Sequence, residues 1–163
     1  MPYAQLLELI GEAPGLKVLE ATTHADGLSE ALARHVQKCG GELQIAAYPG
    51  EHTAHPEGEG ITFYEINSFK SPFKASARDF EFIILNDLLH LHAFAEKLLK
   101  HAYQGLENSA FVIVIQSEGS MPAEEIEAML ERCEYRAGNT IHDLIEGAHV
   151  SVAKKLHMWG NGM

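Results

Sequence analysis

The sequence predicts a three-layer α/β domain with a doubly wound, mostly parallel sheet that ends in an antiparallel C-terminal β-hairpin. Strand-like apolar runs alternate with segments whose apolar residues recur at helical spacing. Two of these runs, 80–85 and 111–115, are almost continuously apolar, as is typical of parallel strands buried on both faces. A chain of 163 residues with 46% apolar composition is long enough for one core, so we expect one domain over residues 1–163.

The first half of the chain is expected to form a β-α-β unit behind a short lead-in helix. Leu6, Leu7 and Ile10 define the apolar face of that helix, and Pro14-Gly15 ends it. The elements predicted here are a helix at 3–12, a strand at 17–21, a helix at 28–38 and a strand at 42–47. Residues 48–60 are rich in proline and glycine and predict a long loop, which in a compact domain is often functional.

The second half continues the alternation of strands and helices. Leu91, Phe94 and Leu98 have the spacing of one helix face, and Pro122 behind Ser120 is typical of a helix start. The predicted elements are strands at 61–66, 80–85 and 111–115, helices at 88–103 and 123–132, and two final strand segments at 139–144 and 149–157. Glu146-Gly147 between the last two indicates a hairpin turn, so the expected core spans 16–157.

Composition excludes several classes of function. The formal charge of −11 and the pI near 5.3 argue against nucleic acid as a partner, because such binding rests on Lys and Arg neutralising phosphates. No apolar stretch approaches the roughly 20 residues of a membrane helix, so we expect no membrane partner. Cys39 and Cys133 lie far apart in helix-like segments, and the start of the chain lacks a signal-peptide pattern. These features predict a reduced, cytoplasmic location.

Several segments resemble the class I S-adenosylmethionine-dependent methyltransferases in sequence and order. Val18-Leu19-Glu20 is similar to the family's first strand with its terminal acid. Residues 61–67, Ser71-Pro72-Phe73 and 79–90 resemble the third strand, the Pro-Phe turn and the fourth strand with its Leu-His helix start. The resemblance implies S-adenosylmethionine as the cofactor and a small molecule as the methyl acceptor.

The resemblance also implies a set of cofactor-binding residues, in which this chain departs from the family. A glycine-rich turn normally lets the backbone approach the methionine portion of the cofactor. His24 and Asp26 stand here where glycines are expected, and Ala47-Tyr48 replaces the acid that meets the ribose, with Glu51 as a substitute nearby. The implied cofactor-binding residues are Glu20, Thr22, His24, Asp26, Tyr48, Asn67 and Asn86.

Three residues are candidates for catalysis, and several of the implied site residues also have a structural explanation. Asp87, His90 or His24 would deprotonate a methyl acceptor. Glu20 is equally compatible with capping the following turn, and Asn86-Asp87 with capping a helix that begins near residue 88. The ring of Tyr48 would stack on adenine or pack over the edge of the core.

Ten histidines suggest a metal-dependent enzyme as an alternative. Neutral imidazoles among carboxylates bind divalent transition metals, although this chain has no Cys pair and no His-Glu-x-x-His pattern. No residue is therefore assigned as a metal ligand. The residues expected near one edge of the sheet are His24, His52, His55, His90 and His92, with Glu51 and Asp87 as further candidates.

Three functions remain open from the sequence. The first is a small-molecule methyltransferase with an altered cofactor turn, and the second is a catalytically inactive methyltransferase-fold protein that serves binding or assembly. The third is the metal-dependent enzyme. The inactive form predicts a filled cofactor cleft and a protein partner or a homodimer, with Met121, Met158 and Trp159 as interface candidates.

Overall fold

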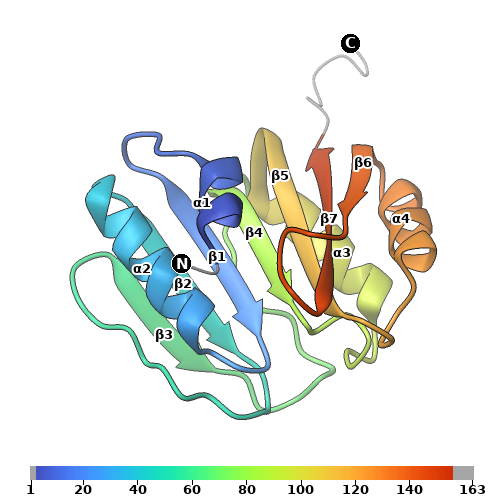
Figure 1. Cartoon of the computed structure of the whole chain (residues 1–163), viewed down its shortest axis with the longest axis horizontal. Coiled ribbons are helices and arrows are strands. Elements are labelled where there is room, and N and C mark those ends of the chain that lie inside the picture. Colours follow the sequence, from blue (N-terminus) through green and yellow to red (C-terminus); the bar gives the residue numbers. More distant parts are fainter. Residues whose placement is uncertain (1–2, 156–163) are drawn as a thin grey trace.

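Residues 3–155 of the computed structural model form a single sheet covered by helices on both faces (Figure 1). The strands are β1 (Lys17–Thr22), β2 (Glu42–Ala47), β3 (Ile61–Glu65), β4 (Phe80–Asn86), β5 (Leu106–Ser117), β6 (Tyr135–Ile141) and β7 (Ala148–Lys155). The helices are α1 (Ala4–Ile10), α2 (Gly27–Lys38), α3 (Ala95–Gly105) and α4 (Ala123–Arg132).

The strand order is β3-β2-β1-β4-β5-β7-β6. The first five strands in the chain pair in parallel, whereas β7 lies antiparallel between β5 and β6. β2 and β3 lie on one side of β1, whereas β4 and β5 lie on its other side, so the carboxyl ends of β1 and β4 flank the position where open α/β sheets bind ligands. The predicted fold class, with its mostly parallel sheet and antiparallel C-terminal strands, is confirmed.

Two apolar layers form the core, one on each face of the sheet. Leu32 of α2 packs with Val18 and Ile84 on the face that α1 and α2 cover. Leu98 of α3 packs with Leu19 on the face that α3 and α4 cover. Neighbouring residues of a strand point to opposite faces, so a strand buried between two helical layers must be apolar at nearly every position. This requirement explains the continuous apolar runs in the sequence.

The helix predicted at 88–103 is wrong over its first half. α3 begins at Ala95, and residues 88–94 form turns instead. Leu91 and Phe94 therefore do not continue the buried helix face and are 45% and 46% exposed.

Long-range contacts explain why residues 88–94 are not helical. The Ala93 N–H donates to the Phe69 carbonyl at 2.9 Å. The His92 ring bonds the Ser71 carbonyl through Nε2 at 3.0 Å and accepts the Phe94 N–H at Nδ1, also at 3.0 Å. These bonds use backbone groups that a helix would need for itself.

Smaller differences concern the ends of elements. α1 ends at Ile10 because Gly11 adopts a φ of +80°, before the predicted stop at Pro14-Gly15. β5 starts at Leu106 and β6 at Tyr135, both earlier in the chain than predicted. The connection before β7 contains Gly147 at a φ of +79°, in agreement with the predicted turn.

Part of the predicted interface lies outside the described residues. Met158 and Trp159 belong to that part, as do residues 156–157 of the expected last strand. Met121 is partly buried and packs against the core. No helix within residues 3–155 is both long enough and apolar enough to cross a membrane.

Candidate functional site

Two side chains of the turn between β1 and α2 accept hydrogen bonds from nearby backbone N–H groups. The His24 N–H donates to Thr22 Oγ1 at 3.0 Å. The Asp26 side chain caps α2 by accepting the Leu28 N–H at Oδ1, at 3.3 Å. Thr22 and Asp26, two of the implied cofactor-binding residues, therefore have structural partners within the turn itself.

The loop that follows β2 lies directly against this turn. The Tyr48 N–H donates to the Thr22 carbonyl at 2.8 Å. A Cβ atom at Gly50 would lie 1.9 Å from the Thr23 carbonyl oxygen, far inside van der Waals contact. Only glycine fits at position 50, because any larger residue would push the loop away from the turn.

His52 joins the same loop to the turn through both ring nitrogens. The Ala25 N–H donates to Nδ1 at 2.8 Å, so the ring proton lies on Nε2, which donates to the Tyr48 carbonyl at 2.7 Å. The next two residues, Thr53 and Ala54, donate their N–H groups to the Ala25 carbonyl at 2.9 and 3.0 Å. Both backbone groups of Ala25 are thus bonded to the loop.

Tyr48 is fully buried behind this loop. Its hydroxyl donates to the Ser71 carbonyl at 2.6 Å, and its ring stacks on Phe69 with centroids 6.1 Å apart. His92 meets the same ring edge-on at 5.8 Å. Burial raises the pKa of the hydroxyl well above its ordinary value. The contacts of Tyr48 are those of a residue packed over the edge of the core, one of the two alternatives considered above.

Glu20 and Asn86, two of the implied cofactor-binding residues, contact each other in the interior. Glu20 is completely buried in β1, where Ser29 donates its hydroxyl to Oε1 at 2.7 Å. The Asn86 amide donates to Oε2 at 3.4 Å. Burial raises the pKa of Glu20 to about 7, and the two hydrogen bonds lower it only in part. The carboxyl group of Glu20 therefore braces β1 against α2 and β4.

A small cavity of about 200 Å³ lies at the carboxyl ends of β1, β4 and β5, under the connection between β6 and β7. It gathers four of the predicted site residues: His24, Asp26, Asn86 and Asp87. Tyr3 and Glu146 line it too, and no sequence pattern indicates that either would lie at this edge.

Asp87 holds β4 to the end of β5. It adopts a φ of +56°, and its carboxylate accepts the N–H and the hydroxyl of Ser117 at 3.1 and 2.8 Å. Its own N–H donates to the Ile115 carbonyl at 2.7 Å. The expected role as a helix cap near residue 88 is wrong, because α3 begins only at Ala95.

His90 lies apart from that cavity, beside Gln116. The buried Gln116 amide donates to His90 Nδ1 at 3.0 Å and to Ser120 Oγ at 2.8 Å, while its carbonyl oxygen accepts the Leu89 N–H. Gln116 was not among the predicted site residues, although it directly follows the apolar run 111–115 of β5. That position was its only signal.

Asn67 lines a second cavity of about 240 Å³ at the ends of β2 and β3. Tyr48, Gly50, His52 and Glu65 line it as well. Glu65 is an acid at the end of β3 that was not predicted as a site residue. The implied cofactor-binding residues are therefore divided among the interior, the cavity of Asp26 and the cavity of Asn67.

The predicted histidine cluster does not converge on a metal site. Within residues 3–155 no group of three or more His, Cys, Asp or Glu side chains has the arrangement of metal ligands. His52 and His92 are engaged with backbone groups, and the His55 ring packs on Phe63 with centroids 4.2 Å apart. The structure thus brings together none of the ligand sets considered from the sequence.

Solved structures with the same arrangement of elements identify the fold. A methyltransferase from Aquifex aeolicus, described as SAM-dependent, superposes with a TM-score of 0.72 at 14% identity, over 95% of this chain and 91% of that one. This chain has the fold of the SAM-dependent methyltransferases. No family model matches the sequence, and no curated protein matches it.

Two further methyltransferase-fold structures are informative because one contains a cofactor and the other a partner protein. Phosphoethanolamine N-methyltransferase 2 of Haemonchus contortus, solved with S-adenosyl-L-methionine, has a TM-score of 0.72 at 11% identity, covering 94% of this chain and 51% of that one. A Haloferax volcanii complex between a methyltransferase activator and a methyltransferase matches with a TM-score of 0.72 at 11% identity, covering 93% and 87%. At these identities the likeness concerns the fold alone.

Proposed function

We propose that this chain is a catalytically inactive methyltransferase-fold protein, which serves as a binding or assembly module. The observation that carries the proposal is the loop of residues 48–54 bonded across the β1–α2 turn. In the methyltransferases that the sequence resembles, this turn is the element whose backbone approaches the cofactor. Here the Ala25 N–H is taken by His52, and Gly50 rests against the Thr23 carbonyl.

The energetic argument concerns what a cofactor would have to displace. Four hydrogen bonds join the loop to the turn through the backbone of Thr22 and Ala25. Each contributes about 1 kcal/mol net, and a buried group left without a partner costs about 1–3 kcal/mol. A ligand that opened the loop would lose that free energy from its own binding.

The adenosine side of the fold supports the same proposal. β2 ends in Ala47 and is followed by Tyr48, so there is no acid at the strand end to accept ribose hydroxyls. Tyr48 is buried and has no exposed ring face for adenine. The two cavities of about 200 and 240 Å³ are each smaller than the roughly 300–1,000 Å³ typical of ligand pockets.

A binding role is consistent with what other proteins of this fold do. The Haloferax volcanii structure is a complex of a methyltransferase with its activator, so the fold can present a surface to a protein partner. We carry over to this chain only that capacity. A homodimer and a heterologous complex are both compatible with it.

Methyl transfer to a small molecule remains the second candidate function, and one observation favours it. His24, Asn86 and Asp87 meet around one cavity at the carboxyl ends of β1 and β4, where this class of sheet places ligands. His24 or Asp87 would act there as the base, whereas His90 lies outside that cavity. This candidate requires the loop of residues 48–54 to move.

Calorimetric titration with S-adenosylmethionine and S-adenosylhomocysteine distinguishes the two functions. We expect no saturable heat up to about 1 mM ligand and no rise in melting temperature. The Haemonchus contortus enzyme, titrated in the same buffer, is the positive control. One-to-one binding in the micromolar range would overturn the inactive assignment and favour methyl transfer.

A further inference from the structure

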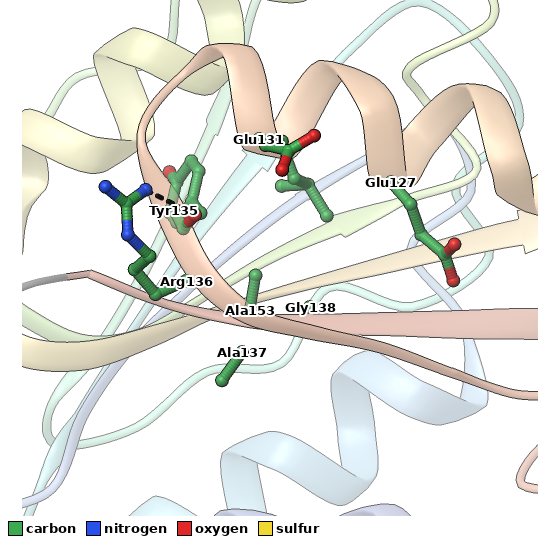
Figure 2. Close-up of a pocket in the computed structure, with 8 residues that line it drawn as sticks. Glu127, Glu131, Tyr135, Arg136, Ala137, Gly138 and Ala153 are labelled. Atoms are coloured by element: carbon green, nitrogen blue, oxygen red, sulfur yellow. Dashed lines mark hydrogen bonds between the residues drawn. The ribbon is translucent and has the colours of Figure 1, made fainter.

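A groove runs between α4 and the edge strand β6, well away from the cofactor side of the fold. Its volume is about 540 Å³, and Figure 2 shows its walls and floor. Glu127, Leu130 and Glu131 belong to α4, while Ala153 belongs to β7. The β6 residues that line it are Tyr135, Arg136, Ala137 and Gly138.

The strand beside this groove has one free side. β6 is the last strand of the sheet and pairs only with β7 among the described strands, with a register shift between Arg136 and Asn139. The residues from Arg136 to Asn139 are exposed. Gly138 leaves the groove open, since nothing lies within 4 Å of the place where its Cβ would be. An edge strand with free backbone groups next to a helix is a surface on which another strand can pair.

Two carboxylates line the wall opposite that edge. Glu127 and Glu131 lie on successive turns of α4, above Ala137 and Gly138 in the view of Figure 2. Within residues 3–155 the Glu131 carboxylate has no hydrogen-bond or ion-pair partner, and the Glu127 carboxylate accepts only the Thr140 hydroxyl.

The spacing of these carboxylates matches an extended chain. Four residues of an α-helix rise about 6 Å. In a β-strand, alternate side chains on one face are about 6.8 Å apart. Basic residues at every second position of a strand would therefore meet Glu127 and Glu131 in turn. The buried side chains of Leu130 and Ala153 add apolar lining to the same groove.

We infer that this groove binds an extended, basic segment of a partner protein, which adds a strand to β6. Lys or Arg side chains at alternate positions pair with Glu127 and Glu131, and the net charge of −11 favours approach of a basic partner. Arg136 at the end of the groove disfavours a basic residue there, which sets the position of the segment. The inference names a partner for the binding role proposed above and rests on that role.

Three labelled hexapeptides test the inference by fluorescence anisotropy with the whole chain. One alternates lysine and valine, one alternates glutamate and valine, and one alternates lysine and proline. The lysine-proline peptide keeps the charge but cannot donate backbone hydrogen bonds at its prolines. We expect the lysine-valine peptide to bind at least about tenfold more tightly than either of the others.

Variants of the groove show where the peptide binds. Gly138→Val fills the groove at a position with open space, and Glu131→Gln removes one charge; we expect each to weaken lysine-valine binding about fivefold or more. Glu125→Gln is the matched control, because it removes the same charge from α4 at a residue that does not line the groove. Circular dichroism and urea unfolding confirm that all three variants are folded.

Two outcomes overturn the inference. Equal affinity for the lysine-valine and lysine-proline peptides would mean that only net charge is recognised. Equal effects of Glu131→Gln and Glu125→Gln, with no effect of Gly138→Val, would place the peptide elsewhere. The calorimetric titration with S-adenosylmethionine is independent of both results, so a failed peptide experiment does not bear on the filled cofactor cleft.

Discussion

His52 Nδ1 accepts the backbone N–H of Ala25 across 27 residues of sequence, at a distance of 2.8 Å. The bond joins the loop after β2 to the turn after β1, which is the turn that approaches the cofactor in the methyltransferases that the sequence resembles. Because Ala25 is fully buried, no solvent is at hand to replace the acceptor.

Replacing His52 is expected to loosen this loop. His52→Ala leaves the Ala25 N–H and the Tyr48 carbonyl without these partners, so we expect the free energy of unfolding to fall by about 1–3 kcal/mol in urea titrations. His55→Ala is the matched control, since His55 is exposed in the same loop and packs only on Phe63. Equal losses in the two variants would contradict the role assigned to His52.

Gly50→Ala should prevent the loop from seating on the turn. The added Cβ would lie 1.9 Å from the Thr23 carbonyl oxygen, a backbone atom that cannot turn aside. Overpacking of this kind costs about 1–3 kcal/mol, measurable by chemical unfolding. Gly138→Ala, in open space, should change stability by less than about 0.5 kcal/mol. If Gly50→Ala left the free energy of unfolding unchanged, the loop would not be held against the turn.

Glu20 makes the stability of the protein depend on pH. Its pKa is about 7 in the folded chain and near 4.5 in the unfolded chain, so the folded state retains a proton that the unfolded state releases first. The stability that the folded chain gains by retaining this proton is fully present below pH 4.5 and is lost as pH rises through 7. The loss amounts to about 3 kcal/mol, from about 1.4 kcal/mol per pKa unit.

Glu20→Gln tests this dependence because the amide stays neutral at every pH. We expect the variant to be more stable than the parent above pH 7 and similar to it near pH 4.5, in urea titrations across that range. Asn86 and Ser29 can both reorient to bond the amide. A difference that is constant with pH would contradict the raised pKa.

Tyr48 and His92 share one acceptor, the Ser71 carbonyl. Tyr48→Phe keeps the packed ring and removes one of the two bonds, so we expect a loss of about 1 kcal/mol in unfolding free energy. The double variant with His92→Ala leaves that carbonyl without either partner. Its loss should exceed the sum of the single losses, and strict additivity would show that the carbonyl is not shared.

The strands could be predicted because their signal is local. Residues such as Ile83, Ile84 and Leu85 must be apolar when both faces of a strand are covered, and this requirement appears in the sequence as a run of consecutive apolar residues. The first half of the predicted helix at 88–103 shows the opposite case. Its apolar spacing is helical, but His92 and Ala93 bond residues near Ser71, and no local pattern reports such a contact.

The candidate site shows the same contrast between features that the sequence predicts and features that depend on long-range contacts. Asn86 and Glu20, both implied by the sequence resemblance as cofactor-binding residues, lie on neighbouring strands and bond each other, because strand order fixes both positions. The resemblance did not reveal that His52 would bond Ala25 or that Glu20 would be completely buried. Those facts depend on how a thirteen-residue loop, 48–60, returns to the sheet.

The place of β7 in the sheet has a consequence for synthesis on the ribosome. β7 comes last in sequence among the described strands, yet it lies between β5 and β6, and no other described strand joins these two. Until its residues emerge, β5 offers an unpaired apolar edge and β6 has no partner at all. The sheet therefore cannot close one strand at a time as the chain grows, and β6 can join it only after β7 has been synthesised.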